Sequence, residues 1–326
     1  KEVAQESNLK YELVNVEWGG LFGGLITGKF DLVISSVGII EERKKRMAFS
    51  IPYMQSGAAI LVRNNMTDIK SLEDLEEQNA TVGAQINTTS HYFLEKYSGI
   101  KINSFGKFIL LTNFQKYVDE FAKINNVQVD GLEKNMPSAT HDNITIINFG
   151  MGSPNAATIM DLLSAIKPKA VLFLGKCGGL KKRIKIGDFI LPIGAIRGEG
   201  TSNDYFPIEV PAMPSFSLQR AISSALKYQK IDYWTGTVYT TNRRVWEYDS
   251  EFKVYLKKTR AYAIDMETAT LFSVGFHNKI PTGALLLTSD SPMTPEGVKT
   301  LKKDEINSKK FDEKHIEIGI SSLKKL

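Results

Sequence analysis

An acidic residue stands near the end of an apolar run in the segment LLLTSDSP, residues 285–292. Asp290 lies there between Ser289 and Ser291. Serine, aspartate and proline are common wherever a strand ends in a turn. However, α/β enzymes also keep their catalytic groups at the carboxyl ends of their strands. Asp290 is therefore a candidate acid–base residue, with an ordinary turn as the alternative.

A second group of candidate residues lies in AIDMETAT, residues 263–270, where Asp265, Met266 and Glu267 follow one another. A carboxylate can accept hydrogen bonds from two vicinal hydroxyls, which is what a ribose offers. The methionine beside it is a soft apolar surface suited to the face of a sugar. This segment therefore indicates a sugar-binding site at Met266 and Glu267.

Three arginines occur in segments rich in hydroxyl and amide side chains. Arg197 lies in IRGEGTSNDY, and Arg243 and Arg244 lie in YTTNRRVWEYD. A guanidinium presents a planar fork of donors that suits a phosphate. Surface salt bridges are the alternative for each of them. For the set of three, phosphate binding and surface salt bridges both stay open.

The segment GMGSPN, residues 150–155, is typical of a glycine turn that opens a helix. Asn155 stands where the dinucleotide fingerprint G-x-G-x-x-G has its last glycine, and no GK[ST] follows, so neither nucleotide loop is supported. The turn is consistent with a purely architectural role. Its backbone N–H groups, including that of Gly152, are also suited to an anion or a polar ligand.

Metal, disulfide and thiol chemistry find little support. The four histidines are scattered and none has a metal-ligand spacing such as HExxH, so we expect neither a metal nor another cofactor. Cys177 is the single cysteine, which excludes an internal disulfide and fits a reducing, cytoplasmic compartment. No histidine lies near it in sequence to activate it, so a packed thiol is the favoured interpretation.

The bulk composition is that of a globular protein of about two domains. The chain has 326 residues, of which 42% are apolar and 24% charged. No apolar run approaches the roughly 20 residues that a membrane helix needs, so we expect no membrane partner. The net charge is +5, and the basic cluster KKRIK lacks an accompanying aromatic stacking motif. A solvated surface is favoured over nucleic acid, and an anionic small substrate would suit the charge.

From residue 104 onward, apolar runs alternate with helical segments. We predict strands at the six ranges 107–114, 143–150, 169–180, 187–196, 235–241 and 283–290, with a helix over 150–166. Such alternation predicts a mostly parallel, mixed α/β sheet flanked by helices. The strands are continuously apolar rather than alternating, which indicates burial on both faces.

Residues 1–103 form a different predicted module. We predict strands at 11–18, 31–39, 58–64 and 81–86, and helices at 20–31, 71–78 and from 87 onward. Gly28 is expected to end the first helix, and Ser71 is a plausible N-cap of the second. The chain starts at Lys1 without an apolar signal segment, so we expect a fragment or a processed chain. The predicted domain boundary lies between residues 103 and 104.

The segment EWGGLFGGLITGKFDLVISSVGIIEERKKRMAFSIPY resembles the first lobe of periplasmic-type amino-acid-binding proteins. The resemblance implies that Arg43 holds the position of the arginine that grips a ligand carboxylate. Thr88 and Thr89 match the start of the binding loop of the second lobe. That family captures ligands by closing two lobes, and most of the second lobe is missing. We therefore expect a partial or vestigial module that binds no ligand well, whose apolar faces pack on another surface or stay loosely folded.

Residues 104–326 resemble the nucleoside phosphorylase and nucleosidase superfamily, and within it the AMP nucleosidases. The resemblance rests on segments in the family's order: FGKFILLTNF, MPSATHDNITIINFGMGSPNAATIMDLLSAIKPKAVLFLGKCGGL, KIGDFILPIGAIRGEGTSNDYFP, YWTGTVYTTNRRVWEYD, AIDMETATLFSVGF and IPTGALLLTSDSP. It implies a phosphorylase-like fold, a homo-oligomer and hydrolysis of the N-glycosidic bond of AMP to adenine and ribose 5-phosphate.

The resemblance also implies roles for single residues. Asp290 would protonate the leaving purine, Glu267 would hold the ribose hydroxyls, and Met266 would pack under the sugar. Arg197, Arg243 and Arg244 become the candidates for the 5′-phosphate, and Gly152, Lys176 and Gly178 further substrate-binding candidates. Phosphorylases of this superfamily use a serine where this chain has Lys176, so water is favoured over phosphate as the nucleophile. A purine nucleoside phosphorylase, an amino-acid-binding fusion and a fusion without function remain the alternatives.

Overall fold

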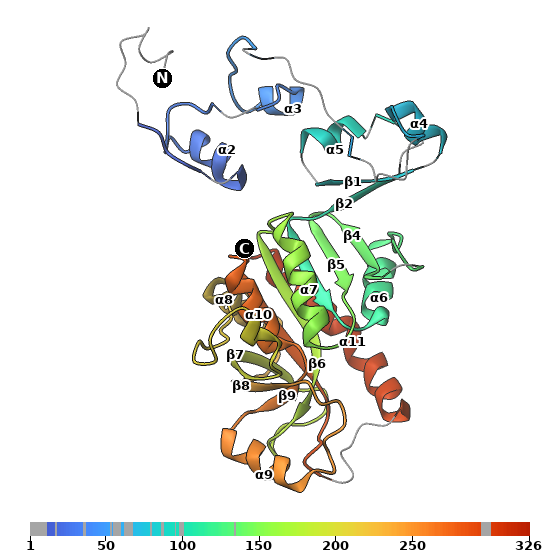
Figure 1. Cartoon of the computed structure of the whole chain (residues 1–326), viewed down its shortest axis with the longest axis vertical. Helices are drawn as coiled ribbons and strands as arrows, with labels where there is room; N and C mark the ends of the chain where they lie inside the picture. The colour runs from blue at the N-terminus through green and yellow to red at the C-terminus, as the bar shows by residue number, and fades with distance from the viewer. Residues whose placement is uncertain are drawn as a thin grey trace. The chain divides into compact units, whose positions relative to one another are not determined.

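The computed structural model describes most of the chain (Figure 1). The described residues are 12–16, 18–34, 37–52, 54, 60–61, 68–78, 80–85, 88–94, 96–97, 101–133, 135–294 and 301–326. They fall into two compact units, residues 1–71 and residues 72–326. The predicted boundary at 103/104 lies inside the second unit and stays a prediction. No helix within the described ranges is long and apolar enough to span a membrane.

The described residues of the first unit include two short helices, α2 (Trp18–Ile26) and α3 (Glu41–Lys44). The helix predicted over 20–31 is confirmed, and Gly28 follows it with a φ of 70°, a left-handed conformation that glycine adopts readily. The strands predicted at 11–18, 31–39 and 58–64 are wrong for the described residues of those segments, which have no strand structure. A strand needs a partner for its backbone groups, and no described segment of this unit pairs with another.

The second unit begins with α4 (Leu72–Glu77), β1 (Thr81–Gln85), α5 (Thr89–Leu94) and β2 (Lys101–Phe105). The strands β1 and β2 pair in parallel as a separate two-stranded sheet, and α5 contacts both. The predicted elements at 71–78, 81–86 and from 87 onward are confirmed, whereas β2 was not predicted. Thr88 and Thr89, the predicted binding-loop residues, lie at the start of α5.

An eight-stranded sheet forms the main body of the second unit. Its strands are β3 (Phe108–Thr112), β4 (Ser138–His141), β5 (Ile144–Asn148), β6 (Ala170–Gly179), β7 (Phe189–Gly198), β8 (Tyr233–Thr241), β9 (Ala263–Asp265) and β10 (Thr282–Asp290). The strand order is β10-β7-β8-β9-β6-β3-β5-β4. Because β10 also pairs with β6, the five strands from β10 to β6 close into a ring. The six strands predicted in this part are all present, and β4 and β9 are additional.

The sheet is mixed and mostly parallel, as predicted. The parallel pairs are β10–β6, β3–β5, β3–β6, β7–β8 and β8–β9, and the antiparallel pairs are β10–β7, β4–β5 and β6–β9. Every residue of β10 is buried except Asp290, which is partly exposed. Such continuous burial requires cover on both faces of the sheet.

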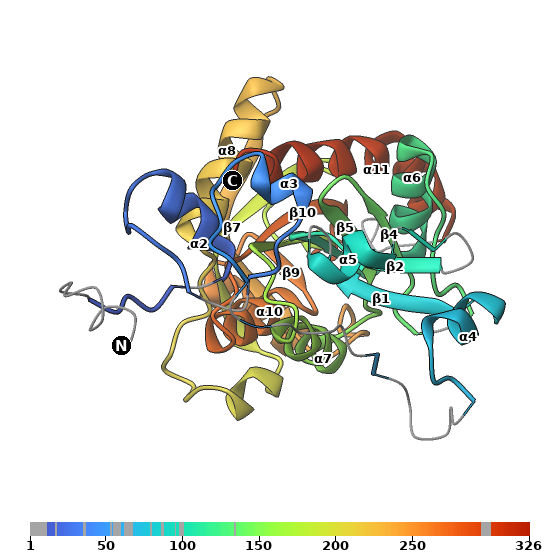
Figure 2. The same cartoon turned by 90° about the horizontal axis from the view of Figure 1, so that it is seen from above.

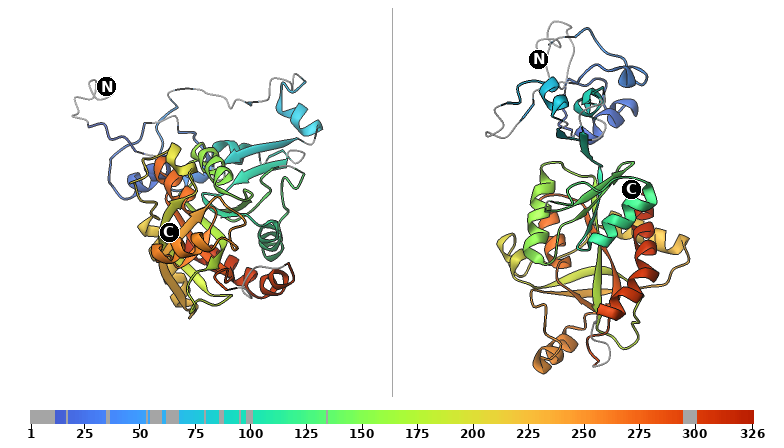
Figure 3. Two further views of the ribbon diagram at one scale, coloured as in Figure 1. Left: turned by 60° about the horizontal axis from the view of Figure 1, so that its bottom comes forward. Right: turned by 90° about the vertical axis from the view of Figure 1, so that its right-hand side faces the viewer.

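Helices supply that cover. The remaining helices are α6 (Gln115–Asn125), α7 (Ser153–Ser164), the 3₁₀ helix η1 (Thr201–Asp204), α8 (Phe216–Tyr228), α9 (Ser250–Thr259), α10 (Thr268–His277) and α11 (Leu301–Leu323). One core, with Met160 and Phe272, lies between the sheet and α7 and α10. The other, with Tyr117 and Ile316, lies between the sheet and α6, α8 and α11. Figure 3 shows α7 on one side of the sheet and α6 and α11 on the other, and Figure 2 shows α11 running between α6 and α8.

Candidate functional site

A cavity of about 110 Å³ lies where the carboxyl ends of β3, β6, β8, β9 and β10 meet. Antiparallel pairing of β6 with β9, at Gly178 and Ile264, brings the ends of the two sets of parallel strands together. The lining residues are Asn113, Phe114, Met151, Lys176, Cys177, Gly178, Thr241, Arg243, Arg244, Trp246, Glu247, Ile264, Asp265, Met266, Glu267, Ser289, Asp290 and Pro292. Seven of the nine predicted site residues are in this set.

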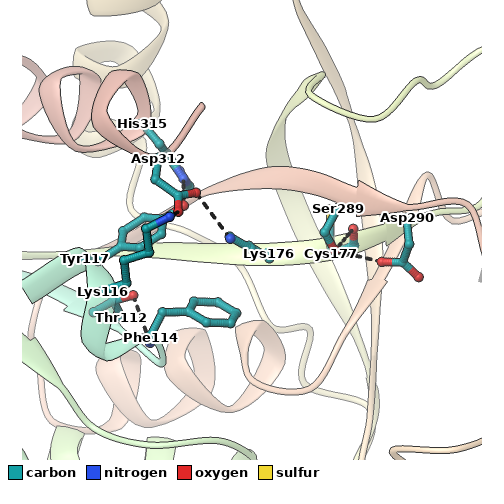
Figure 4. Close-up of polar contacts among 10 residues, drawn as sticks. All are labelled: Thr112, Phe114, Lys116, Tyr117, Lys176, Cys177, Ser289, Asp290, Asp312 and His315. Carbon is teal, nitrogen blue, oxygen red and sulfur yellow. Dashed lines mark hydrogen bonds and ion pairs between the residues drawn. The ribbon is translucent and has the colours of Figure 1, made fainter. Parts of the chain in front are cut away.

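Asp290 lines the cavity at the end of β10 (Figure 4). The pairing of β10 with β6 skips a residue between Thr288 and Asp290, so the strand is irregular at that point. The Ser289 hydroxyl donates a hydrogen bond to Asp290 Oδ1 at 2.7 Å and lies 3.3 Å from the carbonyl oxygen of Cys177. This contact fixes one carboxylate oxygen and leaves the carboxyl partly exposed toward the cavity.

Glu267 is buried, with 2% of its surface exposed. Its Oε1 accepts hydrogen bonds from the backbone N–H of Gly152 at 2.8 Å and from Asn113 Nδ2 at 3.2 Å. Its Oε2 accepts a hydrogen bond from the Met266 N–H at 3.3 Å. Burial and the neighbouring Asp265 raise the pKa of Glu267 to about 8.

The backbone N–H of Gly152 therefore donates to a carboxyl group of the protein itself. It is the N-cap of α7 and has a φ of 95°, which only glycine adopts without strain. Its N–H points to Glu267 rather than into the cavity, which it does not line. The predicted contact of Gly152 with a ligand stays a prediction, because its N–H is directed at Glu267.

Asp265 holds the start of α10. Its Oδ1 accepts from the Thr240 hydroxyl at 2.7 Å, and its Oδ2 accepts from the Thr268 N–H at 2.8 Å and from the Thr268 hydroxyl. Burial raises the pKa of Asp265, and these donors oppose that rise by favouring the ionised form. Two buried carboxyl groups, Asp265 and Glu267, thus lie two residues apart at one edge of the cavity.

The structure brings two of the three predicted arginines to the cavity. Arg243 and Arg244 line it from the loop after β8. Arg243 Nη1 forms an ion pair with Asp249 Oδ2 at 2.9 Å, and its guanidinium lies 5.2 Å from the Phe252 ring centroid. Arg244 is exposed.

Arg197 does not line the cavity, so the structure does not support its predicted contact with a phosphate. Its guanidinium donates to Ser202 Oγ and Asn203 Oδ1 and to three carbonyl oxygens, those of Phe206, Pro207 and Val210. All of these partners belong to the loop that follows β7. Arg197 therefore holds that loop, and no donor remains directed at a ligand.

Lys176 lines the cavity and belongs to a buried ion pair. Its Nζ lies 3.2 Å from Asp312 Oδ1, and the two side chains are only 6% and 4% exposed. The ammonium also lies 4.9 Å from the centroid of the Phe114 ring. Asp312 Oδ2 lies 3.4 Å from the Nζ of Lys116, whose side chain is 51% exposed. Figure 4 shows Lys176 directed toward Asp312, and Asp290 pointing the other way.

His315 lies on α11 close to Asp312 and is fully buried. Its Nε2–H donates to the carbonyl oxygen of Leu285 in β10 at 2.9 Å, and its Nδ1 accepts from the Tyr117 hydroxyl at 3.0 Å. Burial lowers the pKa of His315 to about 3. The imidazole is therefore neutral, and it fastens α11 to the strand that ends in Asp290.

Gly178 and Cys177 fill structural positions at the end of β6. A Cβ added to Gly178 would lie 2.8 Å from the Pro292 ring and 3.3 Å from Ile264, so only glycine fits where the strands cross. Cys177 is 3% exposed, and burial raises the pKa of its thiol well above the ordinary value. A thiol in that state is a poor nucleophile at neutral pH.

Sequence reasoning missed Asn113 and Asp312. A signal existed for Asn113, because it is a polar residue directly after a buried strand, like Asp290. No comparable signal marked Asp312, which lies on a helix among other charged residues.

The chain belongs to the phosphorylase superfamily, whose sequence model matches residues 110–322. Residues 1–191 match the bacterial extracellular solute-binding proteins, family 3, so the chain belongs to that family as well. The two matches overlap over residues 110–191, which lie in the second unit and contain strands β4 to β6 of the eight-stranded sheet. Both predicted resemblances are confirmed.

Three relatives illustrate these memberships. The crystal structure of an AMP nucleosidase from Bacteroides thetaiotaomicron is 58% identical with a TM-score of 0.61, covering 68% of this chain and 88% of that one. The AMP nucleosidase of Escherichia coli is 29% identical over 278 residues, which are 71% of this chain and 57% of its own length. The chain thus spans a little over half of that curated relative. A probable amino-acid-binding protein of Bacillus subtilis, YxeM, is 37% identical over 93 residues, which are 28% of this chain and 34% of its own length.

Proposed function

We propose that this chain hydrolyses the N-glycosidic bond of AMP, giving adenine and ribose 5-phosphate. The observation that carries the proposal is one cavity lined by an acid (Asp290), a buried carboxyl group suited to sugar hydroxyls (Glu267) and two arginines (Arg243 and Arg244). The similarity to an AMP nucleosidase at 58% identity supports the same substrate.

Asp290 is the proposed general acid. When the bond between C1′ and N9 breaks, its electron pair goes to adenine, and a proton on N7 neutralises the charge that develops there. Asp290 supplies that proton, and the Ser289 hydroxyl on its Oδ1 keeps the carboxyl oriented. Water adds to C1′ and loses a proton, which restores the acid. A positioned acid of this kind typically contributes about 10²–10⁴ in rate.

Glu267 and the arginines would bind parts of the nucleotide that do not react. Glu267 accepts hydrogen bonds from ribose hydroxyls while the N–H groups of Gly152 and Met266 hold its carboxyl in place. Arg243 and Arg244 are the candidates for the 5′-phosphate. Binding energy gained at the phosphate can be used to orient and strain the sugar at the reacting carbon.

The cavity is small for a whole nucleotide. Its volume is about 110 Å³, whereas sites for ligands of this size are usually about 300–1,000 Å³. Residues 243, 244, 246 and 247 of the loop after β8 line the cavity, and the intervening Val245 and the following Tyr248 are 69% and 88% exposed. We expect this loop to move outward when AMP binds, because it has little packing to lose on its outer side.

Water is the proposed nucleophile. A phosphorylase would have to hold an inorganic phosphate near Lys176, which is the cation on the β6 side of the cavity. Asp312 lies 3.2 Å from that ammonium, and its negative charge opposes a second anion there. Neutral water meets no such repulsion.

The experiment that tests the proposal is chromatography of AMP after incubation with the full chain in phosphate-free buffer. We expect free adenine and ribose 5-phosphate in equal amounts, unchanged when phosphate is added. Adenine that forms only with phosphate, together with a bisphosphorylated ribose, would indicate a phosphorylase. No adenine under either condition would refute the proposed function.

Residues 1–103 are proposed to be a partial solute-binding module that no longer captures amino acids. Arg43, the residue expected to grip a carboxylate, is 8% exposed, donates to the Gly38 carbonyl oxygen at 2.9 Å and lies 5.0 Å from the Phe22 ring centroid. A thermal-shift screen with the common amino acids should show no stabilisation. A shift that Arg43→Ala abolishes would revive the binding function. A cytoplasmic location and a homo-oligomer also remain proposals.

A further inference from the structure

Asn113 occupies a position between β3 and the buried carboxyl of Glu267. It follows the last residue of β3, lines the cavity and donates from Nδ2 to Glu267 Oε1 at 3.2 Å. The same Glu267 oxygen accepts from the Gly152 N–H at 2.8 Å. Because the amide nitrogen is directed at the carboxyl group, the amide oxygen must lie on the other side of the same planar group.

That amide oxygen, Asn113 Oδ1, is buried and has no hydrogen-bond partner among the described residues. Four other residues in the described part of the chain have buried side-chain atoms of this kind, namely Gln229, Thr270, Thr288 and Asp312. None of the four lines the cavity. A buried acceptor without a donor is costly, so one at the wall of a binding cavity indicates a donor that arrives with the ligand.

We propose that Asn113 is a substrate-contacting specificity residue, whose Oδ1 accepts a hydrogen bond from a ribose hydroxyl. Asn113 Oδ1 and Glu267 are two neighbouring acceptors linked by one hydrogen bond. A vicinal diol brings two neighbouring donors, so each acceptor receives one hydroxyl. The site therefore selects ribonucleotides over 2′-deoxyribonucleotides, and this selection rests on the proposed function for its ligand class.

The preference for ribonucleotides follows from the unpaired acceptor Asn113 Oδ1 of the free protein. Asn113 lines the cavity, so a ribose hydroxyl that enters the cavity can supply the donor that Oδ1 lacks. A 2′-deoxyribose fills the same space but leaves one acceptor unpaired in a site from which water has been displaced. A site built to bind a hydroxyl rejects an analogue that lacks it for this reason. We expect a preference of roughly tenfold to hundredfold.

The test compares kcat/KM for AMP and for 2′-deoxy-AMP in the wild type and in Asn113→Ala. The wild type should prefer AMP, and the variant should retain a preference of no more than about threefold. Asn125→Ala is the matched control, because that amide donates to the Phe121 carbonyl oxygen and lies outside the cavity lining. If Asn113→Ala lowers both values equally, Asn113 only positions Glu267, and the inference is wrong. A wild type without any preference overturns it as well.

A binding measurement separates this inference from the proposed function. Calorimetry with ribose 5-phosphate and 2-deoxyribose 5-phosphate needs no turnover. Tighter binding of the ribose compound, lost in Asn113→Ala and retained in Asn125→Ala, supports the inference even if AMP is not cleaved. Equal binding of the two sugars, or binding of neither, refutes it even if AMP is cleaved.

Discussion

Breaking the buried ion pair between Lys176 and Asp312 should destabilise the protein strongly. The Nζ–Oδ1 distance is 3.2 Å and the two side chains are 6% and 4% exposed. At an effective dielectric constant of about 20, two unit charges at that distance attract by about 5 kcal/mol. Neither oxygen of Asp312 has a hydrogen-bond partner among the described residues, so the carboxylate depends on its ion pairs. Asp312→Asn keeps the shape and removes the negative charge that pairs with the buried Lys176 ammonium.

The expected loss in the free energy of unfolding is about 3–5 kcal/mol, the usual cost of removing one partner of a buried ion pair. Lys116→Met is the matched control, because that lysine pairs with the same carboxylate from a side chain that is 51% exposed. An exposed partner is worth about 0–1 kcal/mol. The double variant Lys176→Met with Asp312→Leu removes both charges and should be more stable than Asp312→Asn.

Urea denaturation of the full chain, followed by tryptophan fluorescence, measures these differences. If Asp312→Asn costs no more than Lys116→Met, the ion pair is not buried in solution and the reasoning fails. The same outcome would remove the electrostatic argument against a phosphate nucleophile, because that argument needs Asp312 beside Lys176.

Three further predictions concern single side chains. Asp290→Asn should lower kcat for AMP by about 10²–10⁴ while AMP still binds, and near-normal turnover would contradict the proposed acid. The pKa of His315 is about 3, below its ordinary value of 6.5. Its contribution to stability is therefore complete above about pH 6.5 and is lost as the pH falls toward 3, and His315→Gln should flatten the fall in melting temperature between about pH 6 and 4. The pKa of Glu267 is about 8, above its ordinary 4.5. Its contribution is complete below about pH 4.5 and is lost as the pH rises to 8, so Glu267→Gln should flatten the fall between about pH 6.5 and 8; an unchanged slope in either variant contradicts the corresponding pKa.

The residues at strand ends were predictable because a buried strand appears in the sequence as an apolar run, and the polar residues that follow the run mark its end. Asp290 and Lys176 follow or lie in continuous apolar runs, and parallel pairing of β10 with β6 brings the ends of those runs together. Glu267 was predicted from the segment around β9, a strand of only three residues that local patterns do not reveal. Its place in the cavity depends on pairing with β6 and β8, which sequence periodicity could not predict.

Arg197 and the first unit show where local reasoning fails. An arginine among hydroxyls and amides suits a phosphate, but the same guanidinium can donate to carbonyl oxygens of the loop that follows its own strand, as Arg197 does. Sequence does not say which acceptors come within reach. The strand-like runs at 11–18 and 31–39 have strand composition, yet their described residues have no strand partner. β-propensity describes side chains that fit a sheet, and it does not supply the sheet.

Helix α11 contacts both β6, which carries Lys176, and β10, which ends in Asp290, although no sequence motif indicated a role for this helix. Asp312 pairs with Lys176 of β6, and His315, close by on the same helix, donates to Leu285 of β10. One helix thus holds the two strands whose ends carry Lys176 and Asp290. Because both contacts are buried, a change at either residue should disturb stability and cavity geometry together. The contributions of the two contacts to stability differ in kind. The contribution of the His315 contact is lost as the pH falls from about 6.5 to 3, whereas the contribution of the Lys176–Asp312 pair is the attraction between two charges.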